Sequence, residues 1–151
     1  MRIAAAALAL LVCCGGSLAD AASSGCYRRS EAVADQALRY TTEVMVMSDT
    51  CRNQTYDRFA LRNRAQLVEF QDAMKEYFRR SGRNAQAKLD SFMTHLANES
   101  ALRTGVQNIG QVCAVAVQFL ATADTMSGEG FRHYAENQVK EHGTEYRFCR
   151  E

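Results

Sequence analysis

No proline occurs anywhere in the 151-residue chain. Proline is the residue that most strongly breaks a helix, so its absence leaves long stretches free to stay helical. Within these stretches, apolar residues recur at alternating steps of three and four, which is the spacing of one face of an α-helix. No run of alternating β-branched residues bounded by turn residues indicates a strand. The sequence therefore predicts an all-α protein.

The apolar spacing predicts five helical segments. The first covers about 30–51 and the second 55–81, where Gly82 provides a stop. The third begins after Asn84 and ends either near 98–100 or at Gly105. The fourth runs from Leu102 to Ala123 and is expected to be the most buried, because 112–123 is apolar almost all round. A short fifth segment covers 131–142, and the short connections favour an up-and-down bundle of four main helices plus a short C-terminal helix.

The amino terminus has the three parts of a secretory signal peptide. Arg2 makes the start positive, residues 3–14 form an apolar run, and small residues follow. The run has twelve residues, and a membrane-spanning helix needs roughly 20. We expect cleavage after Ala21, with Ala19 as the alternative position. The chain then divides into a signal peptide at 1–21 and a single helical domain at 22–151.

Two cysteines inside the leader, Cys13 and Cys14, raise the alternative of a lipid anchor. Acylated cysteines of bacterial lipoproteins follow a leucine and small residues, and the residues before Cys13 and Cys14 match this pattern poorly. The plainer interpretation is that both cysteines are apolar filler in a leader that is removed. We therefore predict an exported protein in the periplasm or outside the cell.

Four cysteines follow the leader, namely Cys26, Cys51, Cys113 and Cys149. An even number of widely spaced cysteines in a small exported chain predicts two disulfides and not a metal site. Cys26 and Cys51 flank a helix of roughly 30 Å, which is too long for a disulfide between them. Of the other pairings we favour Cys51–Cys113 with Cys26–Cys149, because Cys51 and Cys113 both continue apolar helix seams. The third arrangement, Cys26–Cys113 with Cys51–Cys149, stays open.

The formal net charge of the chain is +1, and it is unchanged when the leader is removed, since Arg2 and Asp20 cancel. A balanced charge argues against nucleic acid or an anionic membrane as the main partner. The basic residues are distributed unevenly, however, because the segment 52–83 contains eight of them against four acidic residues. We predict five as a docking face for an acidic protein partner: Arg58, Arg62, Arg79, Arg80 and Arg83. An ordinary solvated helix surface is the competing interpretation.

No catalytic or cofactor motif stands out in the sequence. His133 and His142 lie nine residues apart, which places them on opposite faces of one helix. His95 and Glu99 can face the same way, but two ligands do not make a metal site. We therefore assign no catalytic residue, no metal and no cofactor, and expect surface or capping roles for the histidines.

These features together favour a non-enzymatic protein-binding or structural factor of the cell envelope, whose partner is another envelope or secreted protein. One alternative is a bundle that carries haem, a metal or a lipid-like molecule between its helices. Another is an enzyme with an unrecognised site. Secreted four-helix cytokines are similar in length and in having two disulfides. That resemblance implies a signalling role and long crossover loops, and the connections here are short.

Overall fold

The computed structural model describes residues 25–105 and 108–150. It contains α1 (Arg29–Thr50), α2 (Thr55–Arg62), α3 (Arg64–Arg80), α4 (Ala85–Gly105), α5 (Ile109–Thr125), α6 (Gly128–Glu141) and the single 3₁₀ turn η1 (Gly143–Glu145). Within this described part, extended pairing is limited to an isolated bridge between Tyr27 and Phe148. The all-α prediction is confirmed. The predicted signal peptide at 1–21 lies outside the described residues.

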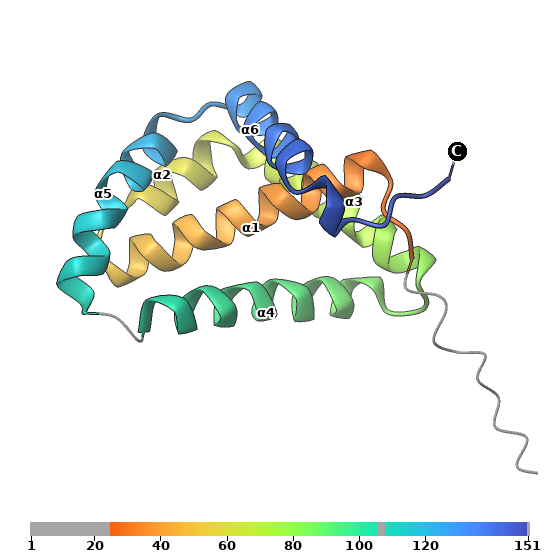
Figure 1. The fold of residues 1–151 in the computed structure, drawn as a ribbon, viewed down its shortest axis with the longest axis horizontal. Coiled ribbons are helices and arrows are strands. Elements are labelled where there is room, and N and C mark those ends of the chain that lie inside the picture. The colour runs from red at the N-terminus through yellow and green to blue at the C-terminus, as the bar shows by residue number, and fades with distance from the viewer. Residues whose placement is uncertain (1–24, 106–107, 151) are drawn as a thin grey trace, which may run out of the picture.

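The first helix, α1, is the centre of the fold, and every other α-helix contacts it. Figure 1 shows α1 passing between α4 and α6, with α3 behind and α5 at one end. Twelve residues of α1 are buried, including the fully covered Ala32, Ala34 and Ala37. Their small side chains allow neighbouring helices to approach closely on several sides of α1.

The prediction that the fourth helical segment is the most buried is wrong. In α5 the buried residues form one stripe, consisting of Val112, Ala116, Leu120 and Ala123. Val115 and Val117 are 81% and 65% exposed. The reason is position: α5 lies at the end of the bundle, and its main contacts within the described part of the chain are with α1, α2 and α4 (Figure 1). Its apolar sequence therefore covers more surface than its neighbours can bury.

The second predicted helix is two helices, α2 and α3, which meet at Asn63. The Asn63 side chain is fully buried and its Nδ2 donates to the carbonyls of Phe59 at 2.9 Å and Met126 at 3.2 Å. This amide connects the corner to the loop before α6. The third segment ends at Gly105, the later of its two expected ends, so Leu102 belongs to α4.

Aromatic rings fill the centre of the molecule around Tyr40. Its ring centroid lies 4.5–6.0 Å from those of four rings on other helices, namely Phe59, Phe119, Phe131 and Tyr134. These tilted and edge-on arrangements are the ones that aromatic pairs prefer. The cluster joins α1, α2, α5 and α6 in a single core.

Both favoured disulfides are confirmed. Cys26 pairs with Cys149, with 4.7 Å between their α-carbons, and Cys51 pairs with Cys113 across 5.5 Å. The first bond joins the segment before α1 to the segment after η1. The second joins the end of α1 to α5, so the two bonds fix opposite ends of the helical body.

Candidate functional site

The five arginines of the predicted docking face fall into two groups. Arg58 and Arg62 lie on α2, whereas Arg79, Arg80 and Arg83 lie at the end of α3 and just after it. The length of α3, about 25 Å for its 17 residues, separates the groups. The structure therefore does not bring all five arginines together on one patch, and a docking role for either group stays a prediction.

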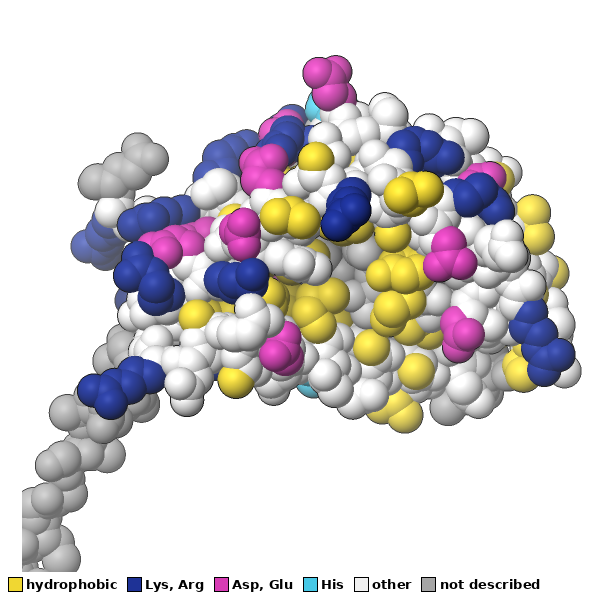
Figure 2. All heavy atoms as spheres, turned by 180° about the vertical axis from the view of Figure 1, so that it is seen from behind, with side chains coloured by type: hydrophobic (Ala, Val, Ile, Leu, Met, Phe, Trp, Pro, Cys, Tyr) yellow, Lys and Arg dark blue, Asp and Glu magenta, His cyan; other side chains and the backbone are white. Residues whose placement is uncertain are grey.

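Two of these arginines are paired with nearby carboxylates at the surface. Arg58 Nε donates to Asp124 at 2.6 Å, and this bond lowers the pKa of Asp124. Arg79 Nη2 donates to Glu76 at 2.7 Å, which lowers the pKa of Glu76. Figure 2 likewise shows basic and acidic side chains interspersed across the back of the molecule. Such neighbouring opposite charges weaken the attraction for an acidic partner.

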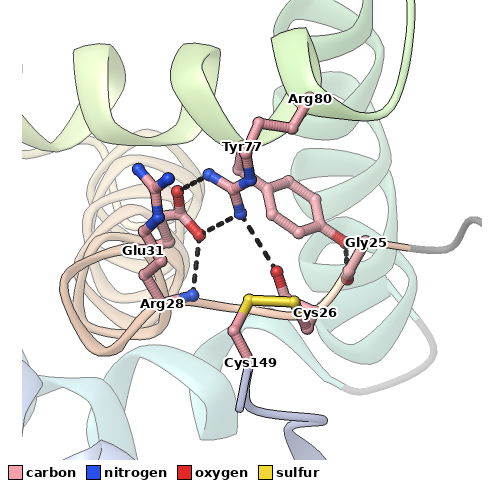
Figure 3. Close-up of a disulfide and its surroundings, with 7 residues drawn as sticks. All are labelled: Gly25, Cys26, Arg28, Glu31, Tyr77, Arg80 and Cys149. Carbon is pink, nitrogen blue, oxygen red and sulfur yellow. Dashed lines mark hydrogen bonds and ion pairs between the residues drawn. A yellow bond between two sulfur atoms is a disulfide. The ribbon is translucent and has the colours of Figure 1, made fainter. Parts of the chain in front are cut away.

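Arg80 belongs to the network that joins the two ends of the domain (Figure 3). Its guanidinium pairs with Glu31, a carboxylate that is only 2% exposed, and Nη2 also donates to the carbonyl of Cys26 at 3.0 Å. The backbone N–H of Arg28 donates to the same carboxylate at 2.8 Å. Because Cys26 is bonded to Cys149, Arg80 serves the structure at this point.

A groove runs along α1 and is bordered in turn by the C-terminal segment, by α4 and α6, and by α4 and α5. Three cavities of about 340, 200 and 360 Å³ make it up. The first and second cavities share Gln36 and Arg39, and the second and third share Glu43 and Arg103, so the three follow one another along α1. The α1 residues along this groove, from Gln36 to Met47, span about 16 Å. We call this feature the α1 groove.

One end of the α1 groove contains a buried carboxylate. Asp35 is 1% exposed, and its Oδ2 accepts hydrogen bonds from Arg39 Nε at 2.9 Å and from the Tyr146 hydroxyl. Asp35 Oδ1 has no hydrogen-bond partner within the described chain. Burial and the nearby Asp35 charge raise the pKa of Tyr146, so its phenol stays protonated and donates. We call this end the carboxylate pocket.

The walls of the carboxylate pocket are aromatic and its rim is polar. The Tyr27 and Tyr146 rings lie 5.1 Å apart with an interplanar angle of 74°. Glu145 and His142 complete the lining, and His142 Nδ1 lies 3.2 Å from Glu145 Oε1. Gln36 Nε2 donates to the Tyr146 hydroxyl at 2.7 Å and holds that ring in place. The pocket thus combines carboxylates with aromatic surface.

The middle of the α1 groove has balanced charge and two unsatisfied hydroxyls. Tyr40 and Ser100 line it, are at least nine-tenths buried, and have side-chain oxygens without a hydrogen-bond partner in the described residues. Burial, then the nearby Tyr134 and Glu43, raise the pKa of Tyr40, so this hydroxyl stays protonated. The charged residues lining the middle are two arginines and two glutamates, namely Arg39, Arg103, Glu43 and Glu99.

The other end of the α1 groove is apolar. Met47 of α1 lies there with four residues of α5, namely Val112, Val115, Ala116 and Phe119. Val115 is 81% exposed, so it is accessible to a partner. The groove therefore changes in character along α1, from carboxylates through neutral hydrogen-bonding groups to apolar side chains.

A larger cavity of about 520 Å³ lies between α1, α2 and α4. Ser48 and Asn53 are among its polar residues, and the Ser48 hydroxyl donates to Asn53 Oδ1 at 2.8 Å. None of the four buried side-chain atoms that lack a partner in the described residues belongs to this cavity. The α1 groove is the better candidate, because it contains unsatisfied polar groups and an elongated shape.

The α1 groove was not predicted from the sequence. Its residues come from α1, α4, α5, α6 and the C-terminal segment, and only folding brings these together. A local signal was available in Asp35, Gln36 and Arg39, three polar residues within five positions of α1. Of the histidines, His95 and His133 are exposed, and His142 follows the last residue of α6.

Among the described residues, no cluster of three or more histidine, cysteine, aspartate or glutamate side chains is arranged to hold a metal ion. No helix within 25–105 or 108–150 combines the length and the apolar character needed to cross a membrane. Comparison of the chain with protein-family models, curated proteins and solved structures finds no significant match.

Proposed function

We propose that this protein is an exported, non-enzymatic binding protein that holds a segment of another exported protein in the α1 groove. The observation that carries the proposal is the shape of the groove, three successive cavities along about 16 Å of α1. Small ligands and cofactors favour one concave pocket that surrounds them. An open, elongated groove fits a peptide segment, which extends in one direction.

The middle of the groove supports a peptide as the ligand. A peptide group is neutral and carries both a donor and an acceptor. The hydroxyls of Tyr40 and Ser100 also donate and accept, and both lack a partner in the described chain. Gln36 and Gln138 add two amide side chains to the same lining. Balanced charge in this part suits a neutral backbone better than a charged small molecule.

Two features support export. Residues 1–21 have the composition of a signal peptide, and disulfides persist in oxidising compartments. We expect the mature protein to begin at Ala22. Amino-terminal sequencing of the protein from cell fractions of its native host tests this, and a chain that still begins at Met1 with free thiols would contradict it.

Site-specific photo-crosslinking in the native host tests the proposed function. A photoreactive amino acid replaces Val115, which lines the apolar end of the groove, and in a second strain Gln138, which lines its middle. Val117 is the matched control, because it is an exposed valine on the same helix but does not line the groove. We expect positions 115 and 138 to crosslink to one segment of one exported protein, and position 117 not to. Equal crosslinking from 117, or none from 115 and 138, overturns the proposal.

A further inference from the structure

We infer that the segment held in the α1 groove places a lysine or arginine side chain in the carboxylate pocket and apolar side chains over α5. This inference rests on the proposed function and adds the chemistry of the partner segment. The two ends of the groove are about 16 Å apart along α1. An extended segment covers that distance in about five residues.

The unsatisfied carboxylate oxygen points to a basic side chain. A buried carboxylate is costly unless donors surround it, and Asp35 Oδ1 has none in the described chain. Asp35 and Glu145 line the pocket together with one guanidinium, Arg39, whose Nε already donates to Asp35. Ammonium and guanidinium groups carry only donors, so they complement this lining. The side chain of Glu145 is 68% exposed and is therefore accessible to an approaching cation.

The aromatic walls support the same assignment. Cations are attracted to the faces of aromatic rings, and the methylene groups of lysine and arginine pack well on apolar surface. Tyr27 and Tyr146 present two rings at 74° to each other in the pocket that contains Asp35. One long basic side chain can therefore contact ring surface along its stem and a carboxylate at its end.

The opposite end of the groove selects apolar side chains. Val115 is 81% exposed and lies with Met47, Val112 and Phe119. Covering such surface is favourable roughly in proportion to the apolar area removed from water. A segment with its basic residue in the carboxylate pocket places residues about five positions away over this surface.

Fluorescence anisotropy with labelled synthetic peptides tests the inference on the full mature protein. The first peptide has one lysine, four serine or glycine residues and two leucines, and the second has the reverse order. The third and fourth peptides are derived from whichever of these two binds more tightly. The third has its lysine replaced with glutamate, and the fourth has its leucines replaced with serine. We expect each replacement to weaken binding at least tenfold, and added salt to weaken the lysine peptide most.

Protein variants assign the effect to the two ends. Glu145→Gln is expected to weaken binding of the lysine peptide about threefold to tenfold. The ratio of affinities between the leucine peptide and its serine derivative should stay unchanged. Val115→Ser is expected to weaken only peptides that contain leucine. The controls are Glu129→Gln and Val117→Ser, which are exposed and lie outside the groove lining. All four sites are at the surface, so folding is not at risk.

Several results would overturn the inference. Equal binding of the lysine and glutamate peptides would show that the pocket does not select a basic side chain. Tighter binding of the glutamate peptide would show that the pocket binds an acidic group, with Arg39 as its partner. Failure of all four peptides also overturns the inference. None of these results decides the proposed function, which depends on the crosslinks from positions 115 and 138. If the crosslinked segment contains no basic residue, the proposed function stands and only the inferred basic side chain of the partner is rejected.

Discussion

Each end of the helical body contains a disulfide, but the surroundings of the two bonds are opposite in character. Around Cys26–Cys149, charged and hydrogen-bonded groups dominate, with Arg80 on the buried Glu31 as the main ion pair. Around Cys51–Cys113, α5 presents a sequence without a charged residue from Ile109 to Ala123. The two disulfides therefore lie in two different kinds of packing, one polar and one apolar.

The difference shows what each bond adds. At the first end, backbone hydrogen bonds already join the two segments, from Tyr27 to the Arg147 carbonyl at 2.8 Å and from Cys149 to the Tyr27 carbonyl at 3.0 Å. At the second end, α5 contacts the body through one apolar stripe and leaves Val115 and Val117 in solvent. A disulfide is most needed where the core cannot hold an element by burial alone. The Cys51–Cys113 bond fits that role.

Removal of one disulfide at a time is the strongest test of this comparison. In the chain-entropy model each bond contributes roughly 4 to 5 kcal/mol to the free energy of unfolding. We expect Cys51→Ser with Cys113→Ser to speed amide hydrogen exchange throughout α5, because one side of that helix is packed against the body and the other is exposed. The matched pair, Cys26→Ser with Cys149→Ser, should leave exchange in α5 slow. Equal exchange in α5 of the two double variants would show that the bonds are equivalent.

Replacement of Arg80 with methionine tests the polar end. Glu31 then becomes a buried carboxylate without its partner, and we expect a loss of about 3 kcal/mol in the free energy of unfolding. Urea denaturation measures the loss. Arg79→Met is the control, because Arg79 pairs with Glu76 at the surface and should change stability little. Combining Arg80→Met with Glu31→Leu should recover most of the loss, and no recovery would mean that Arg80 acts through other contacts.

Two tyrosines allow a hydrogen-bonded hydroxyl to be compared with one that has no partner in the described chain. Tyr146→Phe removes a donor to the buried Asp35 and is expected to lower the free energy of unfolding by about 1–2 kcal/mol. Tyr40→Phe removes a buried hydroxyl without a partner in the described chain, so stability should stay the same or rise slightly. Thermal unfolding compares the two variants. A larger loss for Tyr40→Phe would show that its hydroxyl is already used in the free protein.

The smallest expected effect is that of the surface pair Arg58–Asp124. The hydrogen bond from Arg58 holds the pKa of Asp124 below its ordinary value of 3.8. The stability from this pair is therefore present above that ordinary pKa and is lost as the pH falls through the lowered one. Asp124→Asn should reduce stability slightly at neutral pH, and the difference from the native protein should vanish in high salt or in strong acid. A difference that persists at 1 M salt would contradict this.

Much of the fold followed from local patterns. The apolar spacing within 30–51 predicted α1, and Gly82, which adopts a φ of 133°, marks the end of α3 as expected. The favoured cysteine pairing was correct because the continuous seams place Cys51 and Cys113 toward the same core. The break at Asn63 was missed, since asparagine is tolerated within helices and its role depends on the distant carbonyl of Met126.

The sequence by itself determined the helical class and favoured two disulfides among Cys26, Cys51, Cys113 and Cys149, because helix periodicity and cysteine spacing are local properties; their pairing was decided by the fold. The tertiary structure alone decided which helix is buried and where the α1 groove lies. Burial depends on how many neighbours surround a helix, so α1 became the centre and the more apolar α5 did not. The carboxylate pocket likewise exists only because Asp35 and Tyr146, 111 residues apart, meet in the fold.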